Sequence, residues 1–345
     1  MIKGLLELRM IGTKEAEGII ALKKLNFMDT GLCDENGNKF VYNVTDYMTK
    51  AINWIDRVIL QNKLTNNSSY IKGTIIAEAN YSSAIDGGDP NTYKGVADPT
   101  SFKMYSNLID AILYARKTKI TQRNVRTLWC KVIGDLKANP AADGELYRST
   151  DIQIDGHWSM HYESVPNAMS MYFKNAKSRT TITDCIARHY FFEYVHPFCC
   201  GNGRTGRVLF WEDLIRSVSP IFNIFFCSGV LFQYRGQYFN TFALGRQAID
   251  GFHDITPFME FMLYAIASSL RLPKSAEVFK DSALDYCLRN LNNASVVSRK
   301  DLIDNAPYSP QTISSVLRKL ESEKKILKTV VDGKTYYSFD LSPIL

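Results

Sequence analysis

The sequence predicts a mainly α-helical protein that carries one β-hairpin and ends in a small α+β unit. Apolar residues recur at helical spacing in most segments between residues 71 and 270, as in helices with one buried face. Residues 144–165 differ, because extended runs there flank an Asp155-Gly156 turn that is typical of a hairpin. Residues 275–345 combine short amphipathic helices with two extended runs around Asp332-Gly333.

Helices are expected one after another along the chain. Residues 1–65 have short apolar runs and predict a partly helical N-terminal segment. The next helix runs from Ile71 to Ile85 and is stopped by the residues Gly87-Gly88-Asp89-Pro90. We expect further helices over Ser101–Lys117, Arg123–Leu136, Asn167–Asn175, Ile182–Tyr194, Arg204–Val218, Gln237–Ala248 and Thr256–Leu270.

The composition is that of an ordinary globular protein. A chain of 345 residues with 46% apolar content can bury a large core and is long enough for two or three domains. The formal net charge of +6 is small beside 41 basic and 35 acidic residues, and does not by itself indicate nucleic-acid binding. Seven cysteines without CxxC pairs argue against a disulfide framework. Without a signal-like or membrane-spanning apolar run, we expect a cytoplasmic protein with no membrane contact.

The most informative segment is the run HPFCCGNGRTGR, residues 196–207. The glycines Gly201 and Gly203 lack a Cβ, so the backbone N–H groups between them can approach an anion closely. Arg204 and Arg207 are one helical turn apart, on a helix whose N-terminus itself favours negative charge. His196 carries the side chain whose usual pKa suits a general base at neutral pH. The run therefore predicts a site for nucleotide phosphate chemistry.

This run resembles the signature of the Fic family, His-x-Phe-x-(Asp/Glu)-Gly-Asn-Gly-Arg-x-x-Arg, with Cys200 in place of the acidic residue. The resemblance implies a Fic-type helical bundle with a β-hairpin flap, and transfer of AMP from ATP to a protein hydroxyl. It implies a proton acceptor at His196 and a buried, loop-fixing side chain at Phe198. It further implies contacts to the triphosphate from Gly201, Asn202, Gly203, Arg204 and Arg207.

Cys200 is the departure from the family pattern. The family's acidic residue holds Mg²⁺, and a thiol is a poor ligand for that hard cation. We expect Mg²⁺ to be carried by phosphates and water, with no metal ligand from the protein; weakened activity and altered chemistry are the other outcomes. A Cys200 nucleophile activated by His196 is an alternative, but it leaves the Gly-Asn-Gly-Arg segment unexplained.

The hairpin at residues 144–165 matches the place of the family's flap. An exposed strand edge can pair with an extended target segment and present its Ser, Thr or Tyr hydroxyl. A metal site formed by His157, His161 and Glu163 is an alternative, because these residues share one face of a strand. Three such residues do not close a coordination sphere, so a target-facing flap is the preferred interpretation.

A second family feature lies upstream of the loop. The residues from Ser82 through Asp86 to Gly87 resemble the family's inhibitory motif, with aspartate where glutamate is usual. A carboxylate that reaches Arg207 would form a charge-assisted pair and occupy the space that a γ-phosphate needs. The alternative is that Asp86 only ends a helix, although a carboxylate is electrostatically unfavourable at a helix C-terminus.

The segment 275–345 resembles a winged helix-turn-helix domain. An amphipathic helix is expected over Phe279–Leu291, a turn over Ala306–Tyr308 and a helix capped by Ser309 with Pro310 at its first position. The last of these helices offers polar residues suited to DNA contacts, namely Gln311, Thr312, Ser315, Arg318 and Lys319. Because acidic and basic residues are nearly balanced here, DNA binding and protein docking both stay open.

The expected organisation is an N-terminal helical region over 1–100, a catalytic core over 101–272 and the winged helix over 275–345. The leading function is that of a protein adenylyltransferase, self-inhibited by its own N-terminal helix. One alternative is a nucleotide-binding transcriptional regulator with weak or no catalysis. Another is a changed nucleotide donor, or removal of AMP, in the same pocket. The sequence leaves open the target, the donor base and whether the protein is a homodimer.

Overall fold

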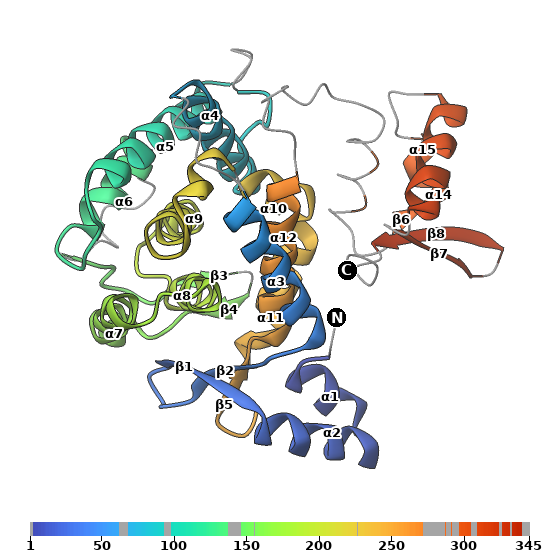
Figure 1. Ribbon diagram of the computed structural model, residues 1–345, viewed down its shortest axis with the longest axis horizontal. Helices are drawn as coiled ribbons and strands as arrows, with labels where there is room; N and C mark the ends of the chain where they lie inside the picture. Colours follow the sequence, from blue (N-terminus) through green and yellow to red (C-terminus); the bar gives the residue numbers. More distant parts are fainter. Residues whose placement is uncertain are drawn as a thin grey trace.

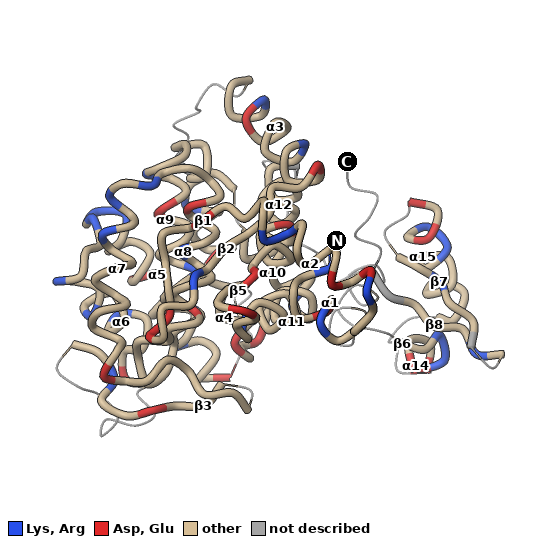
Figure 2. Tube along the Cα trace, turned by 90° about the horizontal axis from the view of Figure 1, so that it is seen from below, with Lys and Arg blue, Asp and Glu red and all other residues tan. Residues whose placement is uncertain are grey.

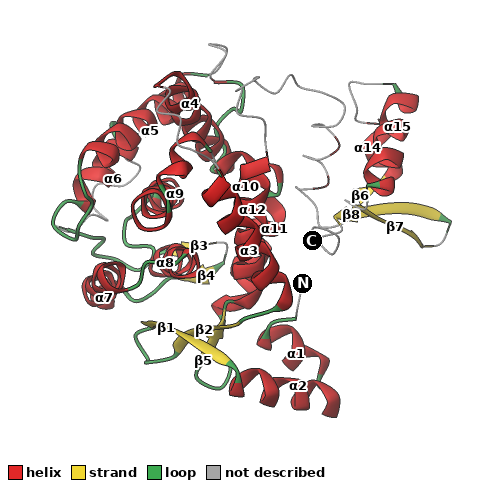
Figure 3. Cartoon of the chain, viewed as in Figure 1, coloured by secondary structure: helices red, strands yellow, loops and turns green. Residues whose placement is uncertain are grey.

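The structure is a computed structural model. It describes residues 3–61, 68–92, 98–136, 146–154, 156–225, 227–271, 287, 291, 297–304, 309–323, 326–331 and 333–339. Helices dominate, with small sheets beside them (Figures 1 and 3), so the predicted mainly α fold class is confirmed.

The helices α8 (Ile182–Val195) and α9 (Asn202–Asp213) form the centre of the molecule. Both are buried along most of their length, as expected of helices with apolar residues on several faces. Figure 1 shows them between two groups of helices. The surrounding helices are α3 (Asp46–Gln61), α4 (Ser68–Ile85), α5 (Pro99–Lys117), α6 (Val125–Ile133), α7 (Val165–Ser178), α10 (Ser228–Gln233), α11 (Arg235–Arg246) and α12 (Thr256–Arg271).

The helices expected between residues 71 and 270 are present, with small differences at their ends. The helix expected over Arg204–Val218 differs most, because α9 ends at Asp213. Residues Leu214–Val218 continue as a π-helical turn, and a 3-10 helix follows over Pro220–Ile224. A single apolar core joins these helices and extends from Leu32 to Leu270.

The N-terminal region contains a sheet that the sequence did not predict. Strands β1 (Phe27–Cys33) and β2 (Lys39–Asn43) are antiparallel, and β2 pairs in parallel with β5 (Phe252–Asp254). The parallel partner is more than two hundred residues away in sequence, which no local pattern indicates. Two helices, α1 (Leu5–Ile11) and α2 (Lys14–Leu25), precede the sheet.

Buried side chains join the strands of this sheet to one another and to α1 and α2. The Phe40 ring stacks on His253 at a centroid distance of 4.4 Å, and His253 Nε2 lies 3.2 Å from the Asp34 carboxylate. Lys23 Nζ lies 3.2 Å from Asp254, whose carboxylate also accepts the backbone N–H of Leu5. The two N-terminal helices are therefore held against β5 of this sheet.

The C-terminal elements have an apolar core of their own, which includes Leu302, Ile313 and Leu317. Ser309 accepts a hydrogen bond from the Thr312 N–H at 3.1 Å, and Pro310 is the first residue of the helix, as expected. The elements are β6 (Val297–Ser298), α14 (Arg299–Asp304), α15 (Pro310–Ser322), β7 (Ile326–Val331) and β8 (Lys334–Phe339), with sheet order β6-β8-β7.

Several expectations lie outside the described residues. They are the turn at 306–308, Asp332 and the helix over 279–291 except Cys287 and Leu291. Acidic and basic residues occur on both the bundle and the C-terminal elements (Figure 2). Within the described ranges, no helix combines the length and apolar character needed to cross a membrane.

Candidate active site

The loop between α8 and α9 is held by its own side chains. The Asn202 carboxamide accepts the Phe198 N–H at 2.9 Å and donates to the Phe198 carbonyl at 2.7 Å, so it closes the loop on itself. Phe198 is buried and stacks on Trp129 with ring centroids 4.9 Å apart. The Asn202 side chain is thus engaged within the loop, which leaves the backbone of this segment to face a ligand.

Glycine is required at the turn into α9. Gly201 has a φ of +68°, and a Cβ there would collide with the Cδ1 of Ile133. At Gly203 a Cβ would lie 3.0 Å from Arg207 Nη1 and 3.1 Å from Asp86 Oδ1. The glycines therefore let α6, α9 and the end of α4 approach the same point.

Arg207 is a deeply buried cation of the site. Its Nε donates to Ser82 Oγ and its Nη2 to the Ser82 carbonyl, each at 2.8 Å. Nη2 also lies 2.8 Å from Asp86 Oδ1. Burial alone would lower the pKa of Arg207, but the Asp86 carboxylate holds it above the usual value.

Asp86 lies between two guanidinium groups. Its second oxygen is 3.4 Å from Arg204 Nε, while Arg204 Nη1 donates to the Val132 carbonyl at 3.4 Å. Asp86 directly follows α4, and Gly87 then turns the chain with a φ of +96°. The structure thus brings Ser82 and Asp86 to the two arginines, a contact that the helix-end interpretation of Asp86 does not explain.

His196 ends α8 in the left-handed region, with a φ of 50°. Its Nδ1 lies 3.2 Å from the Glu193 carbonyl, which assigns the proton to Nδ1 and leaves Nε2 as the acceptor. Burial lowers the pKa of the His196 imidazole to about 4, and the nearby cations Arg246 and Arg148 act in the same direction. The ring is therefore neutral at pH 7 and able to accept a proton.

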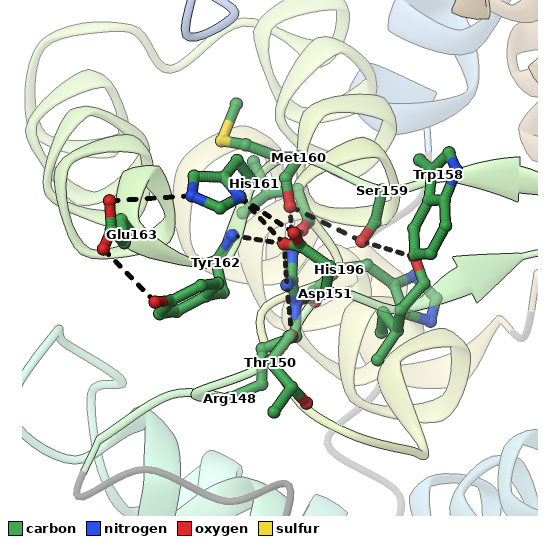
Figure 4. Close-up of polar contacts among 12 residues, drawn as sticks. Arg148, Thr150, Asp151, Trp158, Ser159, Met160, His161, Tyr162, Glu163 and His196 are labelled. Carbon is green, nitrogen blue, oxygen red and sulfur yellow. Dashed lines mark hydrogen bonds and ion pairs between the residues drawn. The ribbon is translucent and has the colours of Figure 1, made fainter.

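Arg148 is a site residue that sequence reasoning missed. Its Nε donates to the His196 carbonyl at 2.9 Å, its Nη1 to the Thr150 carbonyl at 2.7 Å, and its Nη2 to the Met160 carbonyl (Figure 4). One buried guanidinium thus joins the backbone of His196 to both sides of the hairpin. A single arginine in an extended run carries no local signal for such a role.

The observed hairpin is shorter than expected. Strands β3 (Gln153–Ile154) and β4 (His157–Trp158) pair antiparallel, while Asp155 and residues 144–145 lie outside the described part. Arg246 of α11 donates to the Trp158 carbonyl at 2.8 Å. The hairpin is therefore tied to the bundle at both ends.

The strand face on which the alternative metal site depended is not present. The strand ends at Trp158, so His161 and Glu163 lie beyond it, and His161 Nδ1 instead contacts Asp151 at 2.9 Å (Figure 4). In the part of the chain that the structure describes, no group of three or more His, Cys, Asp or Glu side chains is placed to hold a metal.

A cavity of about 360 Å³ opens between the loop, the end of α4, the hairpin and α11. One wall is formed by the loop glycines and the two arginines. Helix α11 contributes the aromatic residues Tyr238, Phe239 and Phe242 to the lining. The remaining lining residues that bear on chemistry are Asp86, His157, Glu193, His196 and Arg246.

Glu193 is a second lining residue that the sequence did not single out. Burial raises the pKa of its carboxyl group to about 8, so this group is largely protonated at pH 7. A Cβ on Gly206 would collide with its Oε1, which shows how closely α8 and α9 approach. The carboxyl side chain of Glu193 thus adds no negative charge to the cavity at neutral pH.

The side chains do not form a protein-held Mg²⁺ site. Cys200 offers a thiol, Asp86 is engaged by both arginines, and Glu193 is largely protonated. Mg²⁺ requires several oxygen ligands in near-octahedral geometry. The side chains of the site therefore do not supply the oxygen ligands that Mg²⁺ needs.

Comparison with known proteins places this loop in a family. Residues 120–212, from before α6 to near the end of α9, match the Fic/DOC family model. The fold is similar to that of a Fic family protein from Desulfovibrio desulfuricans, at 18% identity and a TM-score of 0.58, over 86% of this chain and 97% of that one. The chain therefore contains a Fic/DOC domain.

Two curated relatives are similar to this chain at low identity. A protein adenylyltransferase Fic from Nematostella vectensis is 29% identical over 159 residues, which are 45% of this chain and 34% of the relative. The protein of the same name from Drosophila grimshawi is 26% identical over 162 residues, 46% of this chain and 31% of the relative. The chain thus spans about a third of the length of these relatives.

The site makes a prediction about proton uptake. His196 is expected to stay neutral until the pH falls toward about 4, because burial disfavours its charged form. The pKa of His161 is raised instead, because its ring contacts the Asp151 carboxylate. Imidazole nitrogen shifts measured by NMR over a pH series test both; His196 titrating at or above the usual value of about 6.5 would contradict the assignment.

Arg148 gives a prediction about stability. We expect Arg148→Lys to lower the free energy of unfolding by about 1.5–3 kcal/mol, because an ammonium cannot replace the fork of bonds to three carbonyls. Urea unfolding measures the change. Arg123→Lys, at an exposed position, is the matched control. Equal stability of the two variants would show that the Arg148 contacts contribute little.

Proposed function

We propose that the protein transfers AMP from ATP to a Ser, Thr or Tyr hydroxyl of a protein target. One observation carries the proposal: a neutral imidazole with an available Nε2 lines the same cavity as a glycine turn and two arginines at a helix N-terminus. The relatives named protein adenylyltransferase support the same reaction class.

In the proposed reaction the target oxygen attacks the α-phosphorus of ATP. The bond from that phosphorus to the bridging oxygen breaks, and pyrophosphate leaves. His196 Nε2 takes the hydroxyl proton, while its Nδ1–H stays on the Glu193 carbonyl. The N–H groups at the start of α9 and the guanidinium of Arg204 balance the phosphate charge, with Arg207 toward the γ end.

The other walls fit the rest of the two substrates. An aromatic surface from Tyr238, Phe239 and Phe242 can stack on a nucleobase. The short hairpin also borders the cavity, and 64% of Trp158 is exposed. We propose that an extended segment of the target pairs with this hairpin, whose position Arg148 fixes relative to His196.

The reaction is tested with ATP labelled at either the α or the γ phosphate. We expect protein-bound label from the α position alone, and none from His196→Ala, which should retain its ATP affinity because the imidazole acts on the proton. Gel autoradiography and isothermal titration give the two readouts. Label from the γ position, or wild-type labelling by His196→Ala, would contradict the proposal.

We further propose that Asp86 restrains this reaction. Its carboxylate occupies Arg207 and also contacts Arg204, the cations on which the triphosphate depends. A γ-phosphate placed at Arg207 would meet this carboxylate as a like charge. ATP would then bind in a position unsuited to in-line attack.

Removing the charge of Asp86 tests the restraint. We expect Asp86→Asn to raise auto-labelling roughly ten-fold, which corresponds to about 1.4 kcal/mol of transition-state stabilisation. Asp110→Asn, at an exposed position on α5, should leave labelling unchanged. If both variants label at the wild-type rate and are folded, Asp86 is not a restraint.

A second candidate function concerns the C-terminal elements. We propose that residues 275–345 form a winged helix-turn-helix that contacts DNA through α15. The supporting observation is that Gln311, Thr312, Ser315, Arg318 and Lys319 are all exposed on this helix. Arg318→Ala should weaken binding of duplex DNA and lower its salt dependence, measured by fluorescence anisotropy. No binding at low salt would favour a protein-docking unit.

A further inference from the structure

Two neighbouring cysteines lie in the loop that joins His196 to the glycine turn. Cys199 and Cys200 are the only adjacent cysteines in the sequence. Their Sγ atoms lie 3.8 Å apart, and both residues are half-buried. Burial raises the pKa of Cys185 and Cys227 well above the usual value, which makes those two thiols poor nucleophiles.

The distance between the sulfurs suits bond formation. A disulfide is about 2.05 Å long, so the sulfurs of Cys199 and Cys200 have to approach each other by roughly 2 Å. Adjacent Cα atoms are about 3.8 Å apart, below the usual range for a disulfide, so the bond would be readily reduced. Such a pair is suited to reversible oxidation rather than to a structural cross-link.

We propose that Cys199 and Cys200 are a modification site for low-molecular-weight disulfides, which convert the two thiols reversibly into a vicinal disulfide. In the first step one cysteine thiolate attacks a sulfur of the reagent, and one reagent thiol leaves. The neighbouring cysteine then attacks the cysteine sulfur of this mixed disulfide, and the second reagent thiol leaves. Two electrons and two protons thus pass from the cysteine pair to the reagent.

Formation of the vicinal disulfide, which closes a ring through Cys199 and Cys200, changes the anion-binding turn. The Cys200 carbonyl accepts the Trp129 indole N–H at 2.8 Å, and the next carbonyl, of Gly201, accepts the N–H and hydroxyl of Thr205. Twisting the peptide between the cysteines also turns the next peptide, which carries the Cys200 carbonyl, while the Asn202–Phe198 bonds hold both ends of the loop. We therefore expect the oxidised form to lose the transfer activity, a consequence that rests on the proposed function.

Mass spectrometry tests the modification without any activity measurement. The full chain is treated with oxidised glutathione, alkylated with iodoacetamide and digested with trypsin. Cleavage after Arg188 and Arg204 gives the peptide 189–204, whose only cysteines are Cys199 and Cys200. We expect this peptide to be lighter by two hydrogens and not alkylated, and to take up two alkyl groups when dithiothreitol precedes alkylation.

The outcomes separate the proposal from its competitors. Exposed Cys130, on another tryptic peptide, is the control for complete alkylation. Cys199→Ser and Cys200→Ser should keep a glutathione adduct or stay reduced, because neither can close the ring. Full alkylation of the wild-type pair, a lasting glutathione adduct, or a cross-link between two chains would overturn the proposal.

The expected effect of cysteine oxidation on the loop is tested by fluorescence. We expect oxidation to change the emission of Trp129, and the change to vanish in Trp129→Phe. Label transfer from α-labelled ATP should fall on oxidation and return with dithiothreitol. If the disulfide forms but Trp129 emission and label transfer are unchanged, oxidation does not act on the loop. If the reduced protein transfers no label, the result counts against the proposed function alone.

Discussion

The position of the Arg207 guanidinium is the constraint on which the site depends. A buried cation is stable only when hydrogen-bond acceptors surround it, and here both oxygens of Ser82 and one oxygen of Asp86 supply them. These acceptors lie at the end of α4, so the same contacts bring α4 to the N-terminal part of α9. The proposed nucleotide site and its proposed restraint therefore share one guanidinium.

The loop before α9 is arranged around the same point. Asn202 holds both backbone groups of Phe198, and Arg148 holds the carbonyl of His196, so the imidazole and the turn keep a fixed relation. Because Nδ1 is occupied by the Glu193 carbonyl and the ring is neutral, only Nε2 is left to accept a proton. Arg148, Asn202 and the Glu193 carbonyl thus fix the loop and the ring of the proposed proton acceptor.

The sequence predicted what depends on local pattern. Helix periodicity located the helices of the bundle, and the resemblance of residues 82–87 to the family's inhibitory motif predicted the contact between Asp86 and Arg207. The sheet was missed because β2 pairs in parallel with β5, far along the chain. Arg148 and Glu193 were missed for a similar reason: their roles follow from burial beside His196 and Gly206, and burial of one charged residue leaves no periodic signal.

We propose that Asp86 and the γ-phosphate compete for Arg207, and nucleotide affinities measure this competition. Isothermal titration of ATP and ADP is compared between the wild type and Asp86→Asn. We expect the wild type to bind both nucleotides with similar affinity, and Asp86→Asn to gain clearly more affinity for ATP than for ADP. An unchanged ratio of ATP to ADP affinity would contradict it.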